Sequence, residues 1–139
     1  MTASTADNTL ILESGITVNN LIIAKGNVKV RNGAKIANAT RDAANISSES
    51  KVIFNGAIPQ DMTKGENVRL ITVEDHLLEA IANGGKVTVE EDIVLTKSVT
   101  ISKGNTVILN LNGKTISQSK ECTASYEMIK NNGTLTITG

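Results

Sequence analysis

Residues 86–116 read KVTVEEDIVLTKSVTISKGNTVILNLNGKTI, and this stretch decides the fold. Its aliphatic residues recur every six positions in two series. One series is Val87, Ile93 and Val99, and the other is Val89, Leu95, Ile101 and Val107. Within each short run, aliphatic and polar residues alternate, which is the period of a β-strand. The pattern therefore predicts very short strands joined by turns and stacked coil upon coil.

The same spacing predicts where the coils lie. We expect three strands in the first coil, at 87–89, 93–95 and 99–101. We expect the second coil to hold strands at 107–111, 115–117 and about 127–129, and a third coil to begin at Leu135. The step between coils is then about 20–26 residues, within the range of repeat architectures. Ile, Val and Leu should stack inward in ladders, while Thr, Asn and Lys face water.

One helix is expected before the coils, at residues 72–83, TVEDHLLEAIAN. Thr72 is a suitable N-cap, and Glu74 and Asp75 favour the positive end of the helix dipole. Its apolar residues form one stripe, and Gly84–Gly85 follows as a terminator. The stripe can cover the front of the first coil.

The N-terminal part has a different rhythm. In residues 8–36, pairs of aliphatic residues two positions apart are separated by Gly and Asn, which predicts very short strands and tight turns. Residues 37–50 lose this pattern and are interpreted as a loop, and 51–54 as a strand. The only proline, Pro59, favours a boundary between about 58 and 67.

The chain is therefore predicted to be all-β, with three parts. Residues 1–58 form a β-rich module, 59–71 a linker, and 72–139 a capping helix with the first coils of a parallel β-solenoid. Aromatic residues are nearly absent, with one Phe, one Tyr and no Trp. This composition suits stacked strands with tight turns better than a helical bundle.

Two segments, 81–117 and 128–139 (MIKNNGTLTITG), resemble the first coils of right-handed parallel β-helix proteins of the pectate-lyase-like class. The resemblance covers about residues 68–139. It implies a capping helix followed by stacked coils. It implies no single activity, because the class holds lyases, glycosidases, adhesins and bacteriophage fibres and spikes. The six-residue spacing keeps a left-handed β-helix open as an alternative, although the spacing breaks after Val107.

Charge and composition argue against several classes of protein. The formal net charge is zero and the charges are interspersed, so the basic footprint of a nucleic-acid binder is missing. The N-terminus lacks the basic start and apolar run of a signal peptide. No segment approaches the roughly 20 apolar residues of a membrane span. We expect synthesis in a cytoplasm and release by lysis.

No residue is assigned to catalysis, to a cofactor or to a metal. Residues 84–139 contain neither Arg nor His, and their single Asp, Asp92, lies in a run of acidic residues interpreted as a solvated turn. His76 and Cys122 are expected to be structural, because neither has an evident catalytic partner and Cys122 is the only cysteine. Phe54 and Tyr126 are expected to be packing residues. The sequons at Asn38, Asn45 and Asn132 are interpreted as chance.

These expectations favour a non-enzymatic structural and attachment protein, the N-terminal part of a phage virion appendage such as a head or tail fibre or spike. We expect a homotrimer in the virion that docks on a capsid, portal or tail protein through residues 1–58. Distal regions would contact a host-surface glycan. Two alternatives stay open: a polysaccharide lyase or glycosidase with active coils beyond residue 139, and a bacterial β-helical adhesin, secreted or on the cell surface.

The last residues, KNNGTLTITG (130–139), read as a strand that nothing covers. An uncovered strand exposes unpaired backbone groups and invites aggregation. We therefore expect the coils to continue beyond Gly139.

Overall fold

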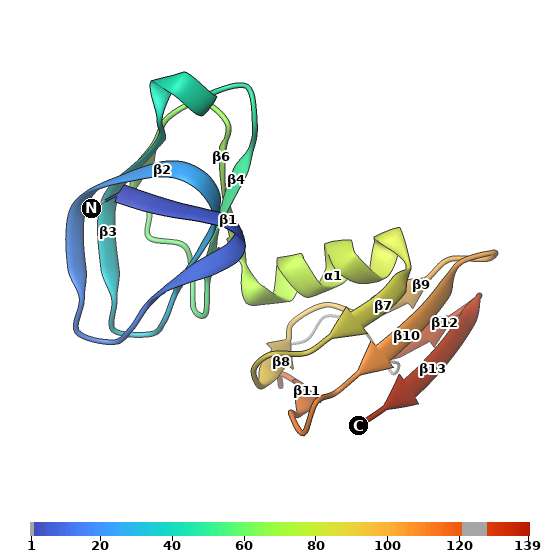
Figure 1. Cartoon of the computed structure of the whole chain (residues 1–139). Coiled ribbons are helices and arrows are strands. Elements are labelled where there is room, and N and C mark those ends of the chain that lie inside the picture. The colour runs from blue at the N-terminus through green and yellow to red at the C-terminus, as the bar shows by residue number, and fades with distance from the viewer. Residues whose placement is uncertain (1, 121–127) are drawn as a thin grey trace. The chain divides into compact units, whose positions relative to one another are not determined.

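A computed structural model describes residues 2–120 and 128–139, and the chain divides into two compact units, Met1–Val73 and Glu74–Gly139. The chain is mostly β-strand with a single α-helix among the described residues, and each of its strand pairs is parallel (Figure 1). The prediction of a β-rich chain with parallel pairing is therefore confirmed, and the arrangement is loosely compatible with a solenoid.

The first unit is built on one six-stranded parallel sheet. Its strands are β1 (Thr2–Leu12), β2 (Thr17–Val30), β3 (Lys35–Arg41), β4 (Ser50–Phe54), β5 (Thr63–Lys64) and β6 (Val68–Thr72). The order across the sheet is β5-β3-β2-β4-β6, and β1 pairs with β2. The sheet curls until it is nearly closed. Its inward face forms the core.

Backbone register aligns the aliphatic residues of this sheet into ladders. Leu12 pairs with Val30, and Val30 pairs with Phe54. All three side chains are buried in the same core cluster. On the polar side, Asn38 donates from Nδ2 to Asn20 Oδ1 at 3.3 Å and accepts from Thr63 Oγ1 at 3.0 Å. The first unit therefore stacks its strands in register, inside and outside.

Two loops interrupt an otherwise constant step of 18 residues. That step separates Ile23 from its partner Arg41, but the separation grows to 24 between Val28 and Val52. The additional residues lie between β3 and β4, where Ala43–Asn45 forms a short 3₁₀ helix. A second loop, between β4 and β5, enlarges the step to 25 between Asn38 and Thr63.

The second unit begins with α1 (Val73–Asn83) and continues with seven short strands. These are β7 (Gly85–Thr88), β8 (Ile93–Leu95), β9 (Val99–Ile101), β10 (Thr106–Asn110), β11 (Ile116–Gln118), β12 (Ile129–Asn131) and β13 (Thr134–Thr138). They form three parallel sheets, β13-β10-β7, β11-β8 and β12-β9. Each sheet therefore stacks a strand of one turn of chain on the corresponding strand of the next.

The predicted coils of the second unit match this pairing. Val87 pairs with Leu109, Ile93 with Ile116, and Val99 with Ile129. The predicted third coil begins with β13, where Leu135 pairs with Val107. The predicted strand at about 127–129 is observed as Ile129–Asn131, and residue 127 lies outside the described residues.

Polar contacts at both ends fix the helix α1 to the first coil. Near its N-terminus, Glu74 Oε1 accepts from the backbone N–H groups of Thr96 and Lys97 at 2.9 and 3.0 Å. At the C-terminus, Asn105 Nδ2 donates to the carbonyls of Ile81 and Ala82 at 3.2 and 3.1 Å. Between these contacts, Leu77 and Ile81 are buried with the core residues of the coils. The helix was predicted one residue longer, from Thr72.

The structure differs from the sequence-based expectation in residues 37–72. Residues 37–41 were interpreted as loop, yet they continue β3, because the buried positions carry Ala39 and Arg41 and so hide the strand pattern. Residues 59–71 were expected to be a linker, yet β5 and most of β6 lie there and pair with β3 and β4. The first unit accordingly extends to Val73 rather than ending at residue 58.

Candidate functional site: a pocket beside strand β3

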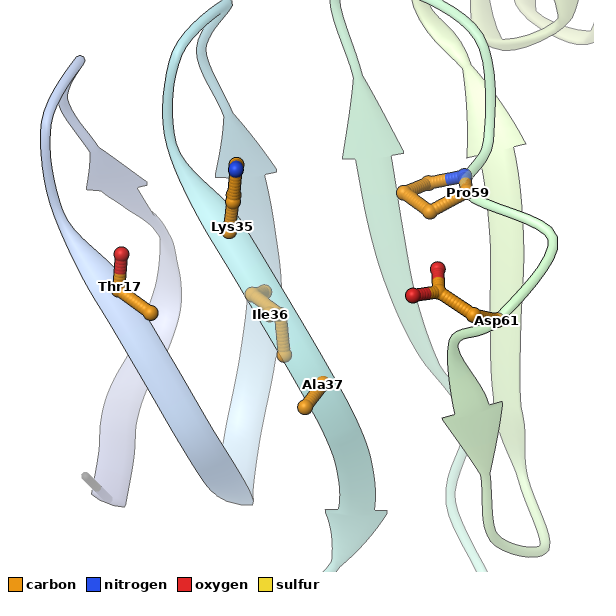
Figure 2. A pocket seen from close by; sticks show the side chains of 6 residues that line it. All are labelled: Thr17, Lys35, Ile36, Ala37, Pro59 and Asp61. Atoms are coloured by element: carbon orange, nitrogen blue, oxygen red, sulfur yellow. The ribbon is translucent and has the colours of Figure 1, made fainter.

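A pocket of about 390 Å3 lies in the first unit, between β3 and the loop that leads to β5. It is lined by Thr17 of β2, by Lys35, Ile36 and Ala37 of β3, and by Pro59 and Asp61 of the loop. Figure 2 shows Pro59 and Asp61 pointing from the loop toward β3. Chain segments far apart in sequence therefore form its two walls.

The pocket exists because β5 starts late. The pairing of β3 with β5 covers only Asn38 and Ala39. Continued backwards, this register would place residues 60–62 opposite residues 35–37. Instead, Gln60 and Asp61 form a turn. The residue before that turn, Pro59, has no N–H to donate to a neighbouring strand. The first three residues of β3 are thus left without a strand on the β5 side.

The walls of the pocket combine apolar and charged groups. Ile36 is buried, with 4% of its surface exposed, whereas Lys35 and Asp61 are exposed. Among the described residues, neither Lys35 nor Asp61 forms an ion pair. An ammonium and a carboxylate on facing walls can pair with a ligand that carries both signs of charge.

Arg41 forms a second polar cluster in the first unit. Its guanidinium donates to Ser50 Oγ at 2.8 Å, to the Asn45 carbonyl at 2.6 Å and to Ser48 Oγ. Arg41 is 6% exposed and Ser50 is fully buried. These partners lie in or beside the loop between β3 and β4, so the cluster holds that loop against the sheet. Its role is structural.

The residues considered from sequence do not converge on a site. Phe54 is buried in the first core, as predicted. His76 is half-buried in α1 and has an interaction partner. Asp92 Oδ1 accepts from the Thr115 backbone N–H at 2.8 Å and so links the turn before β8 to the turn before β11. Cys122 and Tyr126 lie outside the described residues.

Sequence reasoning missed the pocket. Pro59 was recognised only as a boundary signal, and Lys35 and Asp61 were counted among the solvated charges. Only the parallel register of β3 brings these residues together, and no short-range pattern encodes it. Across residues 2–120 and 128–139, no group of three or more His, Cys, Asp or Glu side chains is placed to hold a metal ion.

The chain matches no family model, no curated protein and no solved structure. Within the part of the chain that the structure describes, none of the helices is long and apolar enough to span a membrane.

Proposed function

We propose that this protein is a non-enzymatic structural and attachment protein that forms the N-terminal part of a phage virion appendage. In this proposal the second unit leads into a shaft built as a right-handed parallel β-helix. Residues 1–58 dock on a capsid, portal or tail protein of the particle. The observation that supports the proposal is the strand-on-strand register of the second unit.

A shaft needs a stack that can be lengthened, and the ladders of the second unit have this property. Val87 and Leu109 occupy successive positions of one inward ladder and are 7% and 1% exposed. The next position is Ile137, which is 53% exposed and pairs with Leu109. Burial is thus complete inside the stack and lost at its last strand. A strand edge of this kind can receive a further coil.

The proposal includes a homotrimer, and mass photometry of the full chain tests it. A stable trimer at nanomolar concentration is expected, and a strict monomer over the whole accessible concentration range would contradict it. Docking is tested by deleting residues 1–58 and measuring incorporation into particles. A deletion variant that still attaches normally would contradict the docking role.

A reducing-sugar assay on a panel of bacterial surface polysaccharides tests the non-enzymatic part of the proposal. No product is expected, because the proposal assigns the described residues to stacking and docking. Release of reducing ends that depends on this chain would overturn it in favour of a glycosidase or lyase.

A further inference from the structure

The pocket beside β3 has the properties of a site for one more strand. On the β2 side, Lys35 and Ile36 are paired with Thr17 and Val18. On the opposite side, the β5 pairing begins only at Asn38. A strand edge without a neighbour presents N–H and C=O groups that can pair with another chain. The pocket lies where that neighbour is missing, so its length of three residues corresponds to about 10 Å of strand.

The side chains around this edge define the kind of chain that fits. Ile36, Ala37 and Pro59 offer apolar contact along the pocket, while Lys35 and Asp61 place opposite charges on its two walls (Figure 2). A purely apolar strand would leave both charges without partners. A segment with one acidic and one basic side chain would pair with both, at modest cost because both groups are already exposed.

We propose that the pocket binds an extended segment of a partner polypeptide by strand addition to residues 35–37. Main-chain hydrogen bonds to β3 supply the affinity, and an acidic and a basic side chain of the segment recognise Lys35 and Asp61. This inference does not rest on the proposed appendage role, because it concerns the first unit alone and holds for any partner that presents such a segment.

A selection from a random pool of eight-residue peptides on the full-length chain tests the proposal. The expected winners contain an acidic and a basic residue and bind wild type about tenfold tighter than either K35E or D61K, the loss typical of one hydrogen-bonded charge. The matched controls are K25E and E13K, which reverse exposed charges outside the pocket and should bind like wild type. Circular dichroism checks that every variant is folded.

Amide hydrogen exchange locates the bound peptide. Slower exchange is expected within residues 35–37 and in the loop at 59–61. A winning peptide is also remade with every second backbone amide N-methylated, which removes donors without changing the side chains, and it should lose binding. Three results would overturn the proposal: no enrichment on wild type over the K35E/D61K double variant, protection elsewhere in the chain, or equal binding of the N-methylated peptide.

Discussion

Arg41 shows how a single residue can fix a loop. The guanidinium is buried and hydrogen-bonded to Ser50, Ser48 and the carbonyl of Asn45. Its Nε is buried without a hydrogen-bond partner among the described residues. Burial of a cation is costly, so these bonds must offset a large loss of hydration.

The substitution R41M tests which effect is larger. We expect the free energy of unfolding to fall by about 2 kcal/mol, because the buried Ser50 hydroxyl and the Asn45 carbonyl lose their partner. Urea denaturation measures this loss. The control is R69M, which removes an exposed ion pair with Glu49 at 3.6 Å and should change stability by less than about 1 kcal/mol. An R41M protein as stable as wild type would mean that desolvation cancels the bonds of Arg41.

Gly133 is a second residue whose identity the structure explains. A Cβ atom at this position would lie 2.5 Å from the Ser102 carbonyl oxygen and would also clash with the Asn105 carbonyl oxygen. Both obstacles are backbone atoms, so no side-chain rotation can relieve them.

The substitution G133A should therefore detach the start of β13 from the turn at 102–105. We expect a loss of about 2–4 kcal/mol in unfolding free energy, comparable with other severe overpacking. Faster amide exchange of Thr134, which donates to the Asn105 carbonyl, would locate the damage. The neighbouring exposed residue provides the control, N132A, which should exchange like wild type. Unchanged exchange at Thr134 in G133A would contradict this account.

Among the elements, α1 depends most on contacts that are distant in sequence. Its stripe of apolar residues is typical of any amphipathic helix, but Glu74 and Asn105 attach it to turns more than 20 residues away. The carboxylate of Glu74 also contacts the Thr96 hydroxyl, at 2.9 Å from Oε2. The helix is therefore fixed at both ends as well as along its face.

The substitution E74A should loosen this attachment. We expect a loss of about 1–2 kcal/mol, even though Ala has the higher intrinsic helix propensity. The specific readout is faster amide exchange of Thr96 and Lys97, the two backbone donors to Glu74. Removal of another exposed carboxylate, E66A, should leave both amides unchanged. Equal exchange in E74A and wild type would show that apolar packing alone holds the helix.

The elements also show how far the sequence could predict the fold. The regular aliphatic spacing at 86–116 predicted the strands and their pairing partners, because each inward position in that stretch holds Ile, Val or Leu. The first unit was harder to read. Its parallel register depends on loops of unequal length, and Ala39 and Arg41 occupy inward or buried positions where a strand pattern needs large aliphatic residues. The pocket depends on that register and so could not be predicted.

For the whole molecule, the relevant observation is its division into two compact units with separate core clusters. Leu21 belongs to the first cluster and Leu109 to the second, and each is 1% exposed. Regions with separate cores can open as separate cooperative units.

The matched pair L21A and L109A tests this independence. Each substitution should cost about 2–4 kcal/mol locally, the usual range for a buried leucine. Hydrogen exchange should accelerate only in residues 17–72 for L21A and only in residues 85–120 and 128–139 for L109A. Acceleration of both regions by either substitution would show that the two units unfold together.

The loops that interrupt the 18-residue step of the first unit have a consequence for protein engineering. Each loop adds residues between paired strands, yet the pairing resumes in register on its far side: Val52 still pairs with Val28 and Leu70 with Val52. Chain length in these two places is thus decoupled from the ladder that follows. Foreign sequences such as epitopes or affinity tags can be grafted there, and the segment after Asn45 offers a first site for such display.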